Sequence, residues 1–178
     1  LHNWVKAGNL GGGMSDKNFW REITNNARGA TGARLVALAW FDAATQMVRF
    51  AEWSGISSGP VRLAMDAAAK LVPGFSPFDV TVDLNKNPFT QPAYATGEPI
   101  VAEFEEIASG VVNDRIIQLA MTIGGLRYVY LCPLKSNGEV IGSLSFISTE
   151  TLSPTTRRVC DAFSQQVSLT VENTQLLD

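Results

Sequence analysis

A set of side chains in three β-type segments has the composition of a small-molecule site. The set combines aromatic rings, hydroxyls, a thiol and a guanidinium: Arg49, Trp53, Tyr128, Tyr130, Cys132, Ser143 and Ser145. Alternate residues of a strand point to the same side, so strands over residues 47–53, 127–134 and 139–148 could present this set on one concave surface. Apolar walls with a few hydrogen-bonding groups are what a ligand cavity needs. The alternative is that these are ordinary core or edge residues with satisfied hydroxyls.

Charged residues offer two further kinds of chemistry. Arg49 and Arg127 lie on expected strands, and either guanidinium could bind a carboxylate or a phosphate, with a surface arginine as the alternative. Glu103 and Glu106, with Glu105 between them, could serve acid–base catalysis or bind a metal. Because no histidine or further carboxylate is nearby, we interpret these glutamates as solvated.

Patterns for catalysis or metal binding are sparse. The chain has one histidine, His2, and its two cysteines, Cys132 and Cys160, lack a CxxC spacing. A haem held by a core histidine, and a Ser–His or Cys–His pair inside the fold, are therefore excluded. We expect no catalytic residue, no metal and no cofactor, and we do not expect an enzyme.

The composition favours one globular domain. Of 178 residues, 46% are hydrophobic and 17% are charged, which supplies enough apolar material for a core. The net charge is −3, and the only adjacent basic pair is Arg157–Arg158, so a nucleic-acid partner is not expected. No apolar run is long enough to span a membrane and no signal peptide is recognisable, so no membrane partner and a cytoplasmic location are expected.

Hydrophobic periodicity and turn signals divide the chain into a flexible leader or linker, residues 1–14, and one domain, residues 15–178. We expect helices at 15–28, 57–72, 103–121 and from 153 to the end, with strands at 33–41, 47–53, 127–134 and 139–148. A loop with several prolines covers 73–99 and includes an extended piece at 80–84, and a short strand begins at Ile100. Asn137-Gly138 is the strongest hairpin signal. Helices with a mostly antiparallel sheet make an α+β domain.

Several segments, taken in order, resemble the GAF family. Residues 130–146 (YLCPLKSNGEVIGSLSF) are similar to its "PL…G…viGvL" hairpin, and residues 171–177 (VENTQLL) to the end of its last helix. Residues 41–45 (FDAAT) are similar to its first hairpin turn, and residues 95–100 (ATGEPI) to the approach to a short strand. The resemblance covers about residues 18–178.

The resemblance implies a GAF-like, PAS-related fold and a sensory role. The fold would be an antiparallel sheet of five or six strands, with the N- and C-terminal helices on one face and loops with short helices on the other. The function would be signal transduction: a small molecule binds between sheet and loops, and terminal helices carry the change to an output such as a histidine kinase or a transcriptional regulator. The alternative is a ligand-free module for dimerisation or protein interaction.

The sequence lacks the signatures of three known subclasses of the family, which limits the classes of ligand to be expected. Bilin-binding members attach the chromophore to a cysteine followed by histidine, whereas Cys132 precedes Pro133 and Cys160 precedes Asp161. The Asn-Lys…Phe…Asp-Glu signature of cyclic-GMP binders is missing here, since Gly138 follows Asn137. The free methionine sulfoxide reductases need a cysteine cluster that residues 57–121 lack.

An apolar stripe on the first and last helices suggests a homodimer. The two stripes would lie beside each other and exceed what covering one sheet face requires. The expected interface consists of Phe19, Trp20, Ile23, Phe163, Val167, Thr170, Thr174 and Leu177. The alternative is a monomer.

Overall fold

The computed structural model describes residues 17–177, with side chains through residue 174. The expected leader, residues 1–14, and the expected helix start at Ser15 lie outside this range, as does the side chain of Leu177.

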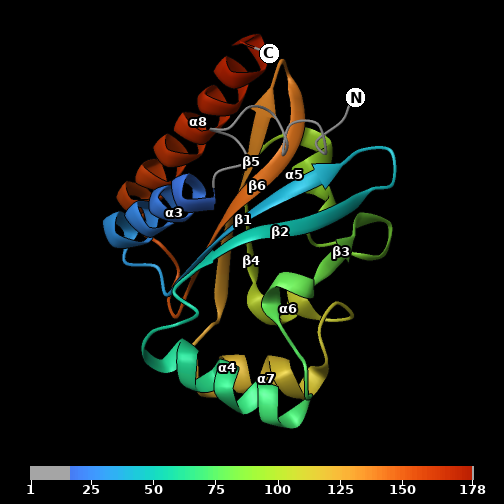
Figure 1. The fold of residues 1–178 in the computed structure, drawn as a ribbon, viewed down its shortest axis with the longest axis vertical. Coiled ribbons are helices and arrows are strands. Elements are labelled where there is room, and N and C mark those ends of the chain that lie inside the picture. Colours follow the sequence, from blue (N-terminus) through green and yellow to red (C-terminus); the bar gives the residue numbers. More distant parts are fainter. Residues whose placement is uncertain (1–16, 178) are drawn as a thin grey trace.

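A six-stranded antiparallel sheet with the strand order β3-β2-β1-β6-β5-β4 forms the middle layer (Figure 1). Its strands are β1 (Leu35–Asp42), β2 (Met47–Ser54), β3 (Thr81–Asp83), β4 (Ile100–Glu103), β5 (Tyr128–Ser136) and β6 (Glu139–Ser148). The hairpin predicted at Asn137-Gly138 joins β5 to β6. Both turn residues have positive φ, 54° and 81°, as the tight two-residue turn requires.

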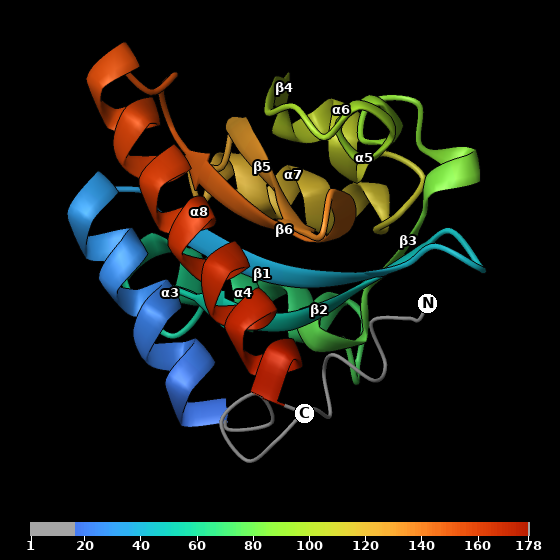
Figure 2. The same ribbon diagram turned by 90° about the horizontal axis from the view of Figure 1, so that it is seen from above.

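Two helices, α3 (Lys17–Thr31) and α8 (Pro154–Leu177), lie side by side on one face of the sheet (Figure 2). In α3 the buried residues Trp20, Thr24 and Ala27 recur at helical spacing and face the sheet. The helix continues to Thr31, beyond its expected end at residue 28, and the left-handed turn comes at Gly32, where φ is +71°.

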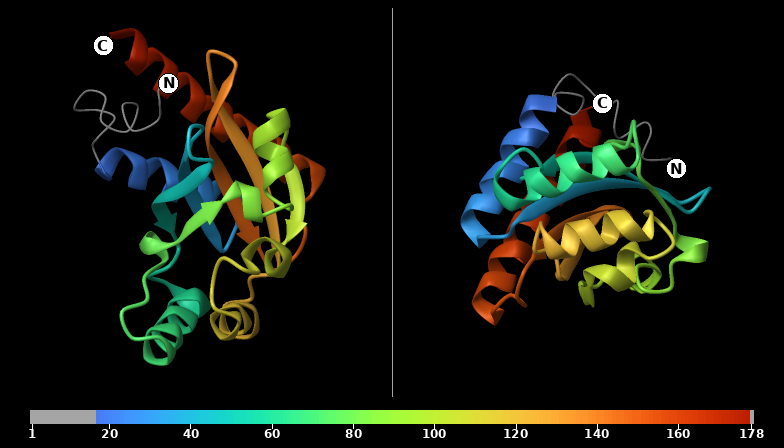
Figure 3. Two further views of the ribbon diagram at one scale, coloured as in Figure 1. Left: turned by 90° about the vertical axis from the view of Figure 1, so that its right-hand side faces the viewer. Right: turned by 90° about the horizontal axis from the view of Figure 1, so that it is seen from below.

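Short helices cover the opposite face, and we call them the cover. They are α4 (Gly59–Leu71), η1 (Pro77–Asp79), η2 (Leu84–Lys86), α5 (Gln91–Thr96), α6 (Phe104–Ala108) and α7 (Asp114–Thr122). Helices α4 and α7 contact each other at one end of the sheet (Figure 3). The single helix expected over residues 103–121 is interrupted, since Gly110 has a φ of +78° and the Asn113 side chain caps a new helix.

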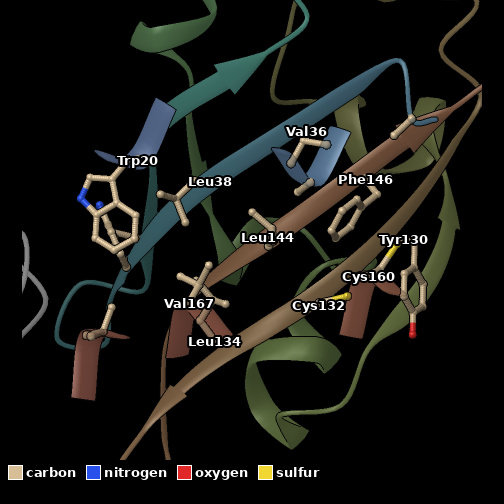
Figure 4. Close-up of a cluster of buried hydrophobic side chains, with 14 residues drawn as sticks. Trp20, Val36, Leu38, Tyr130, Cys132, Leu134, Leu144, Phe146, Cys160 and Val167 are labelled. Atoms are coloured by element: carbon tan, nitrogen blue, oxygen red, sulfur yellow. The ribbon is translucent and has the colours of Figure 1, made fainter. Parts of the chain in front are cut away.

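The sheet therefore separates two clusters of buried side chains. One lies against α3 and α8 and is built around Leu38, Leu144 and Phe146 (Figure 4). The other lies against the cover and is built around Leu35, Leu131 and other apolar residues. This arrangement confirms the predicted α+β class, the number of strands and the placement of the terminal helices on one face.

Across the described residues, every helix is either too short or too polar to span a lipid bilayer.

Candidate functional site

A cavity of about 120 Å³ lies between the sheet and the cover. Strand residues such as Ala37, Val48 and Leu131 form one wall. Cover residues such as Met65 and Ile116 form the opposite wall. Among the described residues that line it, none carries a charged side chain. The cavity is therefore suited to a small apolar molecule.

A few polar groups interrupt the apolar lining. Ser143 and Ser145 of β6 face the cavity, and Trp53 of β2 lines it while its indole Nε1 donates to the carbonyl of Pro77 (3.1 Å). Trp53, Ser143 and Ser145 belong to the set predicted from the sequence. Thr90 and Tyr94 complete the polar lining.

Tyr94 connects the cover to the sheet. Its hydroxyl donates a hydrogen bond of 2.8 Å to Ser143 Oγ, and its ring lies 4.8 Å from that of Phe41, measured between centroids. Burial raises the pKa of Tyr94 well above its usual value, and the hydrogen bond to Ser143 only partly offsets this. Tyr94 is therefore a neutral hydroxyl at physiological pH.

Thr90 stands at the N-cap of α5, but its side chain does not cap the helix. Its backbone N–H donates to Asn87 Oδ1 (3.1 Å), and the residue is one of those that line the cavity. The residue is 4% exposed, and its Oγ1 has no hydrogen-bond partner among the described residues. Such a group is unusual, because buried polar atoms are nearly always paired.

A β-bulge corrects the expected placement of Arg49 beside Trp53. Leu38 pairs with Glu52 but Ala39 pairs with Phe50, so Ala51 has no partner and the alternation of side chains reverses there. Phe50 and Trp53 consequently both line the cavity, with ring centroids 4.5 Å apart, whereas Arg49 is exposed.

The strand register corrects the expected placement of Tyr128, Tyr130 and Cys132. Leu131 pairs with Ser145 and Cys132 with Leu144, so it is Leu131 that shares the cavity face with Ser145. Tyr130 and Cys132 belong to the cluster under α3 and α8 (Figure 4). Tyr128 lies in a separate surface groove with Val101, Leu152 and Arg157.

Both thiols are buried near Asp161 of α8. The Tyr130 hydroxyl donates to Asp161 Oδ1 (2.7 Å), and Cys132 Sγ lies 3.7 Å from the same oxygen. Burial raises the pKa of Cys132 strongly and that of Cys160 to about 12, with the Asp161 carboxylate adding to both. Protonated thiols of this kind are poor nucleophiles.

The predicted dimer stripe is largely used inside the domain. Trp20 and Val167 are core residues and cannot contact a partner, and Phe19, Ile23 and Phe163 are half-buried against the same core. The expectation overlooked how closely α3 and α8 pack on the sheet. The other described members, Thr170 and Thr174, direct their hydroxyls to carbonyls of their own helix.

The remaining charged candidates lie outside the cavity lining. Glu103 and Glu106 form a capping box at the start of α6, and Arg127 is exposed. Within residues 17–177 no cluster of histidine, cysteine and carboxylate side chains could hold a metal ion.

The sequence matches no family model and no curated protein. Solved structures do match it over most of its length. The GAF domain/HD domain protein from Geobacter sulfurreducens superimposes with a TM-score of 0.64 at 15% identity, covering 90% of this chain and 94% of that one. The chain has the GAF fold. The GAF domain of a two-component sensor histidine kinase from Bacillus halodurans agrees with it (TM-score 0.57, 12% identity, 88% of this chain and 95% of that one).

The GAF fold also occurs in an enzyme. Free methionine-R-sulfoxide reductase from Neisseria meningitidis, solved with its substrate, matches with a TM-score of 0.60 at 13% identity, over 91% of this chain and 81% of that one. In the present GAF fold, Cys132 and Cys160 lie on the face of the sheet opposite the cavity.

Two polar residues of the cavity were missed by the sequence analysis. Thr90 and Tyr94 belong to the proline-containing segment over residues 73–99, which was expected to be mostly loop. Their spacing of four residues, next to the Gln91-Pro92 helix start, was the signal that could have placed both on one helix face.

Proposed function

We propose that this chain is a sensory domain that binds a small molecule in the cavity and transmits binding to α8. The observation that carries the proposal is the position of β6. Ser143 and Ser145 of this strand face the cavity, while Leu144 and Phe146 face α8. One strand is therefore in contact with both the proposed ligand and the proposed output helix.

Hydrogen bonds from the β5–β6 hairpin to α8 support the same route. The backbone N–H of Lys135 donates to Ser168 Oγ (3.1 Å), and that of Asn137 donates to Glu172 Oε2 (2.9 Å). The tip of the hairpin is thus attached to the helix. Suppose that α8 has two positions that go with two positions of β6. A ligand that binds the protein more tightly in one of these conformations would shift the population toward it.

The lining supports binding without bond chemistry. Its described residues carry serine, threonine and tyrosine hydroxyls, but no histidine, lysine or carboxylate that could act as a general base to activate them. Sensory members among the structures with this fold, such as the sensor kinase domain from Bacillus halodurans, agree with this role.

Thermal unfolding and native mass spectrometry test the proposal together. Freshly purified protein is examined for bound small molecules, and its melting temperature is measured with a panel of neutral, anionic and cationic compounds. A ligand at 100 times its Kd adds about 2.7 kcal/mol to the free energy of unfolding, which gives a clear increase in Tm.

A variant that fills the cavity makes the test specific. Ala120 of α7 is buried and lines the cavity, so Ala120→Leu should abolish the increase in Tm. Ala162→Leu, the same change at an exposed position of α8, should preserve it. The proposal fails if no compound of any charge class raises the Tm of the unmodified chain, or if Ala120→Leu responds as the unmodified chain does.

A homodimer through the outer surface of α8 is a second proposal, and Leu169 is the observation that favours it. This leucine is 51% exposed in the middle of the helix. Leu169→Glu should lower the dimer fraction measured by native mass spectrometry, whereas Leu63→Glu on α4, which is 57% exposed, should leave it unchanged. A monomeric unmodified chain at all concentrations contradicts this proposal.

A further inference from the structure

We infer that the cavity takes an uncharged, single-ring aromatic molecule with one polar substituent, and that Thr90 Oγ1 forms the hydrogen bond to that substituent. The inference rests on the proposed function and adds the chemical class of the ligand and the residue that orients it.

The charge of the ligand follows from the lining. None of the described lining residues is an arginine, lysine, histidine, aspartate or glutamate, and the wall is almost entirely hydrocarbon. An ion that leaves water for such a cavity loses its hydration without gaining a partner of opposite charge. Carboxylates, ammonium compounds and phosphates, nucleotides among them, are therefore disfavoured as ligands.

The size of the ligand follows from the cavity volume of about 120 Å³. An engineered cavity of about 150 Å³ lined by leucine, isoleucine and phenylalanine binds benzene, whereas sites for drug-sized ligands measure about 300–1,000 Å³. One ring therefore suits this volume.

The aromatic character follows from the side chains around the cavity. Phe50, Trp53, Phe75, Tyr94 and Phe104 all contribute to the lining. Phe50 and Trp53 lie with their centroids 4.5 Å apart and their planes inclined by 32°. Rings packed at tilted angles favour another flat ring over a flexible chain, because both faces and edges of the ligand find partners.

The polar substituent follows from Thr90. Thr90 lines the cavity, and its buried hydroxyl has no hydrogen-bond partner among the described residues. The neighbouring Tyr94 hydroxyl already donates its proton to Ser143. The Thr90 hydroxyl can both donate and accept, so a phenol, a neutral amide or a ketone on the ring would satisfy it.

Phenol, toluene and benzoate are the probes that test this inference, since they share a ring and differ in their substituent. Their affinities for the full 178-residue chain are measured by NMR titration at pH 7, in the unmodified chain and in Thr90→Val. The valine keeps the shape of the side chain and removes its hydroxyl. Thr45→Val, in the exposed turn between β1 and β2, is the matched control.

The expected readout is a change in selectivity. One hydrogen bond corresponds to a factor of about five to ten in affinity, so Thr90→Val should reduce the preference for phenol over toluene by this factor. Toluene should bind Thr90→Val at least as well as the unmodified chain, and benzoate should bind neither. Thr45→Val should behave as the unmodified chain does. Nuclear Overhauser contacts between phenol and the Thr90 methyl group, measured in the unmodified chain, provide a readout that no folding defect can disturb.

Each adverse outcome separates this inference from the proposed function. Selectivity that is unchanged in Thr90→Val, phenol without contacts to Thr90, or benzoate that binds more tightly than phenol would overturn the inference. So would a failure of both neutral probes alongside a ligand of another class that stabilises the unmodified chain but not Ala120→Leu. In that case the sensory proposal stands. If no compound of any class binds, both proposals fail.

Discussion

The phenolic hydroxyl of Tyr94 donates its hydrogen bond to Ser143 Oγ across 2.8 Å, and this bond joins α5 of the cover to β6 near the centre of the sheet. Tyr94→Phe and Ser143→Ala are each expected to lower the free energy of unfolding by about 1–2 kcal/mol, because each leaves the other group without its partner. Combining them should reveal a coupling of about 1 kcal/mol in urea unfolding experiments.

Tyr128→Phe is the matched control for this cycle, since Tyr128 lies outside the cavity. It should cost little stability and should show no coupling to Ser143→Ala. Strictly additive effects of Tyr94→Phe and Ser143→Ala would show that the bond does not stabilise the domain.

Glu52 should make stability depend on pH. Burial raises its pKa, and the guanidinium of Arg21 only partly offsets this. The folded state thus holds the proton more tightly than the unfolded state, whose pKa is near 4.5. The stabilisation from this group is complete below pH 4.5 and is lost as pH rises through the folded pKa. Glu52→Gln should therefore gain stability relative to the unmodified chain between pH 4.5 and 7, measured by urea unfolding at several pH values.

The ion pair between Glu52 and Arg21 does not reverse this expectation. Its atoms are 4.0 Å apart and Arg21 is largely exposed, so the pair is weak. Glu22→Gln, at an exposed position of α3, should show no such pH-dependent gain. A difference between Glu52→Gln and the unmodified chain that stays constant with pH would contradict the prediction.

Both thiols should react slowly while the chain is folded. Cys132 and Cys160 are buried, and burial raises the pKa of each. Labelling with Ellman's reagent at pH 8 should be more than about a hundredfold slower than in guanidinium, because it requires local opening. Leu169→Cys supplies an exposed thiol for comparison. Fast labelling of either native cysteine would show that α8 leaves the sheet readily.

Replacing glycine by alanine should lower the free energy of unfolding at one position and raise it at another. At Gly142 of β6, a Cβ would meet the carbonyl of Ala39 and the ring of Trp40, so Gly142→Ala should cost about 1–3 kcal/mol. At Gly29, inside α3, a Cβ meets nothing within 4 Å, so Gly29→Ala should add about 0.5–1 kcal/mol. Thermal and urea unfolding measure both, and equal signs for the two variants would contradict this account.

The elements of the fold were largely predictable because their signals are local. Asn137-Gly138 predicts the turn of the last hairpin, and the alternation of side chains between two faces in residues 139–148 predicts a strand. The exception over residues 103–121 has a local cause too, since the left-handed backbone of Gly110 ends one helix before Asn113 begins the next.

The composition of the cavity was less predictable because it depends on pairing between strands. Alternation in β5 and β6 gives two faces for each strand, but only the pairing of Leu131 with Ser145 decides which faces coincide. Likewise, the bulge at Ala51 depends on the partner strand β1. Ser143 and Ser145 were therefore correctly grouped with each other, while Tyr130 and Cys132 were assigned to the wrong side of the sheet.

Strand β6 also constrains how this protein can vary in sequence. Interiors are packed so closely that they hardly compress, and Leu144 and Phe146 press on α8 from the strand whose other side borders the cavity. If α8 carries the output as proposed, trimming or enlarging either side chain would shift the helix without any ligand present. Under that proposal, mutations that leave the domain permanently on or off are to be sought beneath the helix, at residues that do not line the cavity.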